Sequence, residues 1–530
     1  MNSSKIDFMR CCQVVLKEGL IAIALTGAAL SLSLFSAAPA RAASCESLTT
    51  MALPDTKIDM AQMVPARGLK LAAPRGGGEE AAAANTPRYQ DLPEFCRVAA
   101  TIKPTSDSDI KMEVWLPASG WNGKFLAVGN GGWAGSISYS AMASALQRGF
   151  ATASTDTGHT GGSGSFVQGH PEKLADYAGR GIHEMTVKAK AITDAFYGDA
   201  PKFAYFQGCS TGGRQGYTEA QRYPADYDGI VVGSAANPRS TLALWQTWVG
   251  VIAMKDPANN IPTSKLPTIH AAVLEACDAK DGLKDGLIDD PRKCDFDPKV
   301  LLCKGEDGPT CLTAAQVQTA KRLLSPIKDS RTGLEYSAGL LPGSELLWAP
   351  DVTGTAPRFS ATDHFKYVVF KDPNWDWKTL NPDTDAPKAA ETESHINATD
   401  PNIKAYLSHG KLLVSQGWAD QNIPPVFAIN YYESVVKTLG GAAKVEDSYR
   451  LFMAPGMGVC GGGDGPNTFD MLRAMQQWVE KKQAPDQVIA SHITDGKVDR
   501  TRPLCPYPQI AKYKGSGSTD DAANFACKLP

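Results

Sequence analysis

The sequence lacks several features that would each indicate a particular class of protein. It has no run of basic residues and a formal net charge of −3 over 530 residues, so no surface for nucleic acid is expected. It has no C-x-x-C pair with nearby histidines, which argues against a zinc site. It has no internal repeat. Its composition, with 43% hydrophobic and 21% charged residues, is that of an ordinary globular protein.

Long apolar runs are also missing after the N-terminal segment, so no membrane span is expected in the rest of the chain. Residues 1–42 are predicted to be an export signal. Three basic residues precede an apolar run from Leu20 to Phe35, and Ala40-Arg41-Ala42 supplies an A-x-A cleavage site. A transmembrane anchor is the alternative, but Gly, Thr and Ser interrupt the run. We therefore predict a secreted or periplasmic protein.

Ten cysteines remain after this segment, and an even number in an exported protein predicts a set of disulfides. Proximity in the sequence suggests three of the pairs, and these leave two more. The predicted pairs are Cys277 with Cys294, Cys303 with Cys311, Cys505 with Cys527, Cys45 with Cys96, and Cys209 with Cys460.

Short β-type runs alternate with helical patterns, which predicts an α/β fold with a mostly parallel sheet between layers of helices. The expected strands are residues 111–116, 123–128, 150–155, 203–207, 229–232, 411–416 and 448–453. This rhythm is absent from residues 239–396, which are rich in Pro, Asp, Trp and Cys. We predict a core of residues 43–238 and 397–530 with 239–396 as an inserted lid domain. Residues 76–84 are expected to form an exposed loop.

The segment Gly208-Cys209-Ser210-Thr211-Gly212 has the G-x-S-x-G pattern of a nucleophile elbow. The pattern alone occurs often by chance, but here it follows an apolar strand and precedes a helix, as the motif requires. Glycines two positions before and after the serine are needed because a side chain there would collide with the tight turn. The context favours Ser210 as a nucleophile at a helix N-terminus, where free N–H groups stabilise an oxyanion.

A second glycine-rich segment, Val128-Gly-Asn-Gly-Gly-Trp133, follows an earlier strand. An oxyanion hole needs two donors, and the backbone N–H of Thr211 would be one of them. Gly131 or Gly132 would supply the other. A purely structural turn is the alternative for this segment alone.

These motifs resemble those of the tannase and feruloyl esterase family. The resemblance extends from about Cys45 to the C-terminus and rests on residues 208–215, 128–132, 154–159, 417–420 and 423–425. It implies an α/β-hydrolase core with a lid, and a secreted serine esterase that acts through an acyl-enzyme. The substrates it implies are small aromatic esters of the hydroxycinnamoyl, galloyl or terephthalate type. Lid residues Trp375 and Trp377 could stack on a phenolic ring or be core residues.

The family resemblance also implies a catalytic arrangement built from a Cys-Ser pair, an Asp and a His-Cys pair, with the two cysteines bonded. Cys209-Ser210 and Asp420 match this arrangement, and Cys460 matches its last half. The bridge would hold the loops of the nucleophile and of the general base together. Asp420 follows an expected strand, so its carboxylate could orient a histidine, although an Asp after a strand is more often a turn residue.

The sequence departs from the family at Val459, which stands where the catalytic histidine belongs. Valine cannot transfer a proton, so impaired turnover is expected. No other histidine follows Asp420 in a comparable loop. The histidines are at positions 159, 170, 183, 270, 364, 395, 409 and 492. Three explanations remain open: a pseudo-enzyme that binds aromatic acids or esters, a residual esterase whose base is a water or a displaced histidine, and a substituted form of an active protein.

The disulfide loop from Cys277 to Cys294 is acidic, with glycines that let the chain curl. Carboxylates at this spacing suit Ca²⁺, although the spacing is not that of an EF-hand. The family resemblance implies a structural calcium ion, and a solvated acidic turn is the alternative. The implied ligands are Asp278, Asp281 and Asp285 with the carbonyls of Leu283 and Leu287.

Overall fold

The computed structural model describes residues 42–71, 87–133 and 135–530, and residues 42–530 form one compact unit. The expected loop at residues 76–84 lies outside the described residues. Residues 1–41 of the expected export signal also lie outside them, so the signal stays a prediction.

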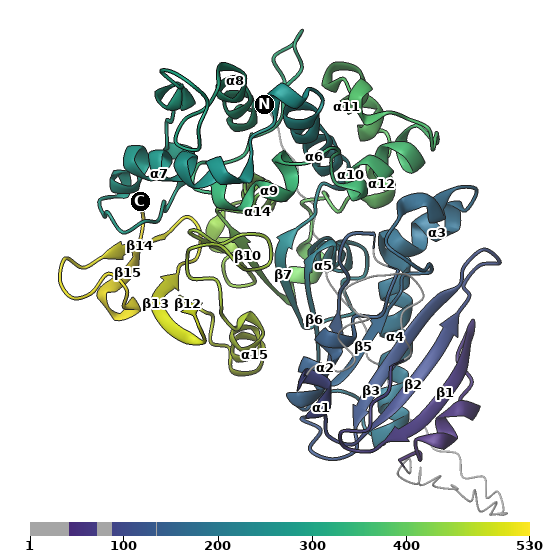
Figure 1. Ribbon diagram of the computed structural model, residues 1–530. Coiled ribbons are helices and arrows are strands. Elements are labelled where there is room, and N and C mark those ends of the chain that lie inside the picture. The colour runs from purple at the N-terminus through teal and green to yellow at the C-terminus, as the bar shows by residue number, and fades with distance from the viewer. Residues whose placement is uncertain (1–41, 72–86, 134) are drawn as a thin grey trace, which may run out of the picture. The chain divides into compact units, whose positions relative to one another are not determined.

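A nine-stranded mixed sheet organises the described chain (Figure 1). In spatial order its strands are β1 (Thr56–Val64), β2 (Phe95–Ile102), β3 (Ile110–Pro117), β5 (Ala151–Thr155), β4 (Lys124–Val128), β6 (Phe203–Ser210), β7 (Gly229–Ala235), β10 (Lys411–Gly417) and β11 (Tyr449–Ala454). Neighbouring strands pair antiparallel from β1 to β5. From β5 to β11 every neighbouring pair is parallel.

All seven strands expected from the sequence are present, and the predicted α/β class is confirmed. Two strands of the antiparallel edge, β1 and β2, were not expected. β1 interrupts its buried positions with exposed and half-exposed ones, so it lacks the continuous apolar run that marks the central parallel strands.

Helices cover both faces of the sheet, and successive side chains of its central strands enter different hydrophobic clusters. In β4, Phe125 and Ala127 belong to one cluster, and Leu126 and Val128 belong to the other. The first cluster includes residues of α4 (Gly181–Tyr197), α5 (Thr211–Arg222) and α14 (Val426–Leu439). The second includes residues of α2 (Tyr139–Gln147) and α15 (Met471–Lys481).

The chain between β7 and β10 adds no strand to the nine-stranded sheet. It forms α6 (Arg239–Met254), α7 (Leu266–Cys277), α8 (Ala314–Leu324), α9 (Ala349–Val352), α10 (Phe359–Asp363), α11 (Pro382–Ala390), α12 (Glu393–Ile396) and α13 (Lys404–Leu407), with a ribbon of β8 (Ile327–Lys328) and β9 (Glu335–Ser337). Most of these helices group at the top of Figure 1. Two hydrophobic clusters lie mainly within this segment. Its status as a separate lid domain stays a prediction.

The remaining elements include α1 (Pro87–Gln90), α3 (Pro171–Ala175) and two C-terminal ribbons. One ribbon pairs β12 (Val488–Thr494) with β13 (Lys497–Leu504), and the other pairs β14 (Ile510–Tyr513) with β15 (Phe525–Lys528). Within the described ranges, no helix combines the length and hydropathy that a bilayer span requires.

All five predicted disulfides are present. Four of them join residues that lie 8 to 51 positions apart. The bridge between Cys209 and Cys460 spans 251 positions and connects the end of β6 to the loop after β11.

Candidate active site

Ser210 is the last residue of β6, and α5 begins at Thr211. Its backbone has φ 59° and ψ −117°, a strained conformation for a residue with a side chain. Hydrogen bonds hold the turn on both sides. The Gly212 N–H donates to the carbonyl of Asn130 at 2.7 Å, and the Ala236 N–H donates to the carbonyl of Ser210 at 2.9 Å. This geometry is that of the nucleophile elbow predicted from the sequence.

The elbow requires glycine at positions 208 and 213, because backbone atoms of neighbouring segments approach these two residues closely. A Cβ atom at Gly208 would lie 2.5 Å from the carbonyl carbon of Gly212. One at Gly213 would lie 2.6 Å from the carbonyl oxygen of Gly233. Neither neighbour is a flexible side chain, so the start of α5 can pack against β6 and β7 only without these side chains.

The half-buried Ser210 lies in a cavity of about 460 Å³. The cavity is also lined by Gly131, Gly132 and Thr211, so the structure brings the predicted oxyanion donors to the predicted nucleophile. The Thr211 hydroxyl donates to the Gly132 carbonyl at 2.7 Å. The Tyr177 hydroxyl donates to the same carbonyl at 2.8 Å. These bonds fix the glycine loop beside the helix start, whose first N–H groups have no intrahelical acceptor.

Asp420 lies three residues after β10 and is 2% exposed. Its Oδ1 accepts the N–H groups of Asn422 and Ile423, at 2.9 and 2.8 Å. Its Oδ2 accepts the Gln416 side-chain amide at 2.9 Å. Burial raises the pKa of the Asp420 carboxyl to about 6, although these donors act in the opposite direction. The carboxylate is thus held in a fixed orientation in an environment of low polarity.

The loop that carries Val459 is held between Asp420 and the elbow. The Ala419 N–H donates to the Met457 carbonyl at 3.0 Å. At the other end, the Cα atoms of Cys460 and Cys209 are 5.9 Å apart across their disulfide. Val459 is half-buried and packs against the largest hydrophobic cluster of the insertion. The position therefore has an apolar side chain where the predicted arrangement needs a base.

No histidine lines the cavity of Ser210, although all eight lie in the described part of the chain. His159 and His364 both contact Trp133, which does line it. The His159 Nε2 is 2.5 Å from the Trp133 carbonyl, and burial lowers the pKa of His159 to about 4. His364 is fully buried, and burial together with Arg239 holds its pKa well below the ordinary value.

Several residues of the cavity were not expected from the sequence. They are Arg239, Leu242 and Gln246 of α6, Arg358, Phe359 and Ser360 at the start of α10, and Asn422 and Ile423 after Asp420. Phe359 is 62% exposed and presents an aromatic ring there. Trp375 and Trp377 do not line this cavity; both are partly buried and pack against the cluster that contains Phe365. No local pattern in the sequence distinguishes these three aromatic residues.

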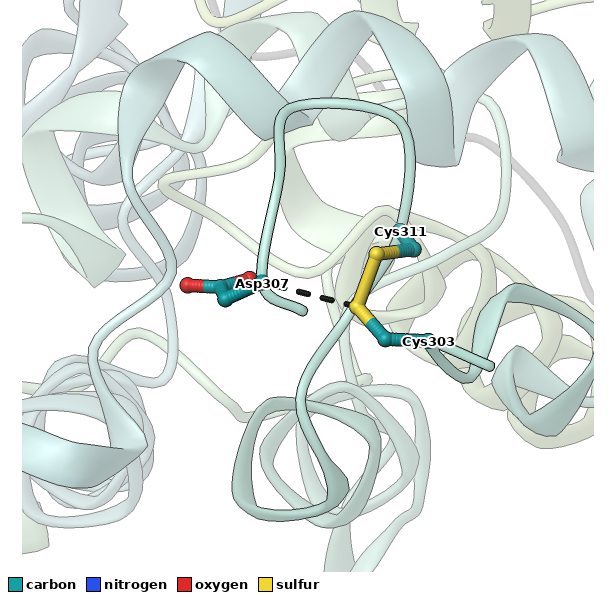
Figure 2. Close-up of side chains that lie close together, drawn as sticks. All are labelled: Cys303, Asp307 and Cys311. Atoms are coloured by element: carbon teal, nitrogen blue, oxygen red, sulfur yellow. Dashed lines mark hydrogen bonds between the residues drawn. A yellow bond between two sulfur atoms is a disulfide. The ribbon is translucent and has the colours of Figure 1, made fainter. Parts of the chain in front are cut away.

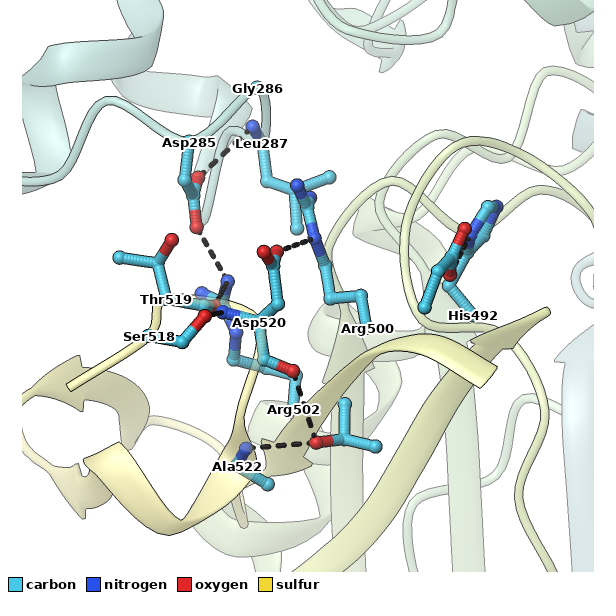
Figure 3. A network of polar contacts seen from close by, with 12 residues as sticks. Asp285, Gly286, Leu287, His492, Arg500, Arg502, Ser518, Thr519, Asp520 and Ala522 are labelled. Carbon is cyan, nitrogen blue, oxygen red and sulfur yellow. Dashed lines mark hydrogen bonds and ion pairs between the residues drawn. The ribbon is translucent and has the colours of Figure 1, made fainter. Parts of the chain in front are cut away.

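The acidic loop is closed by the disulfide between Cys277 and Cys294. Asp278 is 3% exposed and accepts the N–H groups of Asp285 and Gly286. Figure 3 shows that Asp285 reaches the C-terminal ribbon, where its Oδ2 accepts Arg502 Nη2 at 2.5 Å. The residue types fit Ca²⁺ because the loop offers carboxylate and carbonyl oxygens. In the described structure the three predicted carboxylates are not all within 4.8 Å of one another, and their mutual repulsion opposes convergence without a cation.

One other group of ligand-type side chains in the insertion consists of Cys303, Asp307 and Cys311 (Figure 2). The two sulfur atoms are bonded to each other, so neither is a thiolate that can bind a metal. Asp307 forms an ion pair with Lys265. The disulfide and the ion pair account for this group.

The raised pKa of Asp420 predicts how stability depends on pH. Its folded-state pKa of about 6 lies above the ordinary 3.8, so its contribution to stability is fully present below pH 3.8 and is lost as the pH rises through 6. Asp420→Asn stays neutral throughout. The unfolding free energy of the parent, relative to this variant, is expected to fall by roughly 3 kcal/mol between pH 4 and pH 7. Urea unfolding of both proteins at several pH values measures this difference.

The matched control is Asp495→Asn, which changes an exposed turn carboxylate. Its unfolding free energy should follow that of the parent across the same pH range. A constant difference between the parent and Asp420→Asn would show that Asp420 is not held as a buried carboxyl.

Comparison with known proteins gives one family model that matches the chain, described as tannase and feruloyl esterase, over residues 96–528. An uncharacterized esterase of Xanthomonas campestris pv. campestris is 37% identical, over 92% of this chain and 91% of that protein. A protein named "Probable feruloyl esterase B-2" from Aspergillus terreus is 35% identical, over 82% of this chain and 86% of that protein.

A solved structure gives the same result at the level of the fold. The crystal structure of feruloyl esterase B from Aspergillus oryzae superposes with a TM-score of 0.84 at 31% identity. The superposition covers 91% of this chain and 99% of that one. The similarity therefore includes the insertion as well as the sheet.

Proposed function

The chain belongs to the tannase and feruloyl esterase family of carboxylic ester hydrolases, and from this premise we propose that it cleaves small aromatic esters with Ser210 as nucleophile. The main support for the proposal is the strained turn at Ser210. Ser210 lies in one cavity with Thr211, Gly131 and Gly132. The substrates proposed are hydroxycinnamoyl, galloyl or terephthalate-like esters. Phe359 lines the cavity and is exposed, so it offers a ring for an aromatic acyl group.

In the proposed reaction, the Ser210 Oγ attacks the ester carbonyl carbon and the carbonyl oxygen becomes an oxyanion. The N–H of Thr211 and that of Gly131 or Gly132 stabilise this charge. The alcohol then leaves with a proton, and an acyl-enzyme on Ser210 remains. Water attacks the acyl-enzyme, releases the aromatic acid and restores the Ser210 hydroxyl.

The step expected to limit the rate is removal of the Ser210 proton. In the family arrangement a histidine would take it, oriented by Asp420. Val459 offers no acceptor, so the proton must pass to water, and turnover is impaired. Loss of one member of a catalytic triad still leaves about 10³-fold to 10⁴-fold catalysis over the uncatalysed reaction, from the oxyanion hole and binding.

A second candidate function follows from the absence of histidine in the cavity. The chain would then bind aromatic acids or esters without turning them over. One experiment separates the two functions: the purified protein and Ser210→Ala are assayed against feruloyl, galloyl and hydroxyethyl terephthalate esters. Slow hydrolysis that disappears in Ser210→Ala supports the esterase. Binding of the esters without hydrolysis supports the binder.

We also propose that the protein acts outside the cytoplasm. Five disulfides support this location, because such bridges form and persist in oxidising compartments. N-terminal sequencing of the exported protein tests the proposed cleavage near Ala43.

Calcium is proposed as a structural ion of the acidic loop, with Asp278, Asp281 and Asp285 and the carbonyls of Leu283 and Leu287 as ligands. Chelation is then expected to lower the melting temperature, and excess Ca²⁺ should restore it by mass action on the folded state. Mg²⁺ at the same concentration should restore it much less, because it requires a stricter octahedral geometry. Calorimetry measures both effects.

Asp281→Asn serves as the matched variant for the calcium experiment, since it removes one proposed charge and keeps the size of the side chain. Its melting temperature should respond much less to Ca²⁺. An unchanged melting curve in chelator, with no metal found by elemental analysis, would remove calcium from the proposal.

A further inference from the structure

Three side chains with metal-ligating groups meet near the C-terminal end of α5, away from the elbow. His183 comes from the first turn of α4, Glu219 from α5, and Asp226 from the turn before β7. One ligand atom of each lies within 4.8 Å of the other two. The reaction proposed for Ser210 uses none of them.

Glu219 is the unusual member of this group. It is fully buried, and neither of its carboxylate oxygens has a hydrogen-bond partner. A buried carboxylate without a partner is costly in free energy. Lys190 is the nearby ammonium group, but its Nζ donates to the backbone carbonyl of Asp226. Arg222 is the second nearby cation, and its Nη2 donates to the backbone carbonyl of Asn397, so neither cation is hydrogen-bonded to Glu219.

The other two side chains leave the group accessible. The His183 Nδ1 lies 2.7 Å from Asp226 Oδ2, and the imidazole ring stacks on Tyr223 at 4.0 Å. The side chains of His183 and Asp226 are 28% and 11% exposed. The partly exposed edge of His183 gives a route from solvent.

We propose that His183, Glu219 and Asp226 form a binding site for a divalent transition-metal cation, with Zn²⁺ as the ion that suits them. An imidazole nitrogen with two carboxylates is a ligand set of this class, and one water would complete a tetrahedron. The cation replaces the proton between His183 and Asp226 and supplies the missing partner of Glu219. Hard cations such as Ca²⁺ are disfavoured because they prefer oxygen ligands.

The distance of this site from Ser210 indicates a structural role for the ion. Glu219 lies nine residues after Ser210 along α5, which corresponds to about 13 Å. The ion is therefore too far away to touch a substrate at Ser210. It would connect α4, α5 and the start of β7, and so brace the helix that carries the elbow.

The test uses the full chain without an affinity tag, in buffer saturated with Ca²⁺ so that the acidic loop does not take up the probe. Titration with Zn²⁺ is expected to show one equivalent bound and a rise in the melting temperature. Co²⁺ should give the visible absorption of a tetrahedral N/O site. Glu219→Gln keeps the shape of the side chain and removes its charge, and it should weaken Zn²⁺ binding at least tenfold.

Two further variants make the test specific. His183→Gln alters a partly exposed ligand, so it provides the measurement if Glu219→Gln does not fold. His170→Gln changes an exposed histidine that pairs with Asp107, and its Zn²⁺ affinity should match that of the parent. Absence of Zn²⁺ binding by the parent, or equal binding by His183→Gln, would overturn the proposal.

Discussion

Val459→His is expected to raise the kcat for aryl esters by a factor on the order of 10³, because it supplies the general base that the cavity lacks. The neutral Ser210 hydroxyl is a poor nucleophile until a base takes its proton. Asp420 is already buried and held by three donors, so it is ready to orient an imidazole. Steady-state kinetics with a feruloyl or terephthalate ester measure the gain.

Three controls define the result of the Val459→His experiment. Val459→Gln fills a similar space without a base and should give no gain. Ser210→Ala and Asp420→Asn, each added to Val459→His, should remove most of it. Imidazole needs more room than valine, so a modest loss of stability is expected as well.

Two outcomes would contradict this prediction. If the parent hydrolyses aryl esters rapidly through Ser210 and Val459→His adds nothing, another group is the base. If neither protein hydrolyses any ester but both bind aromatic acids, the chain is a binder.

The second large effect is expected from the disulfide between Cys209 and Cys460. Replacing both residues by alanine should lower the unfolding free energy by about 5 kcal/mol, because chain entropy favours the unfolded state most when a long loop is released. The loop spans 251 positions. The bridge also joins the residue before the proposed nucleophile to the residue after position 459. Denaturant unfolding of the double variant measures the loss of stability.

The bridge between Cys303 and Cys311 is the matched control, since it spans only 8 positions and lies in the insertion. Its removal should cost about 2.5 kcal/mol by the same entropy relation. In the Val459→His background, loss of the long bridge should lower kcat, while loss of the short bridge should leave kcat unchanged. Equal effects of the two pairs on kcat would show that the long bridge does not position the site.

Local patterns in the sequence were sufficient to predict much of the fold. The seven expected strands are apolar runs between turn residues, so each could be located without knowledge of its neighbours. Ser210 could be placed at a strand-to-helix turn because the glycines around it have a steric role within a few residues. Strand β1 was missed because its buried residues Ile58, Ala61 and Val64 are three positions apart, so it lacks the alternation of a half-buried strand, and only its pairing with β2 makes it part of the sheet.

The sequence by itself determined the α/β class and the disulfide pairs, since these depend on residue type and spacing. The assignment of position 459 to the missing base came from the resemblance to the family, and it stays a prediction. Only the tertiary structure decided which side chains meet. Phe359 reaches the cavity of Ser210 and Trp375 does not, although both are aromatic residues of the insertion. Asp285 meets Arg502 across 217 positions. Such contacts depend on how distant segments pack, because local periodicity fixes the face of an element and not its partner.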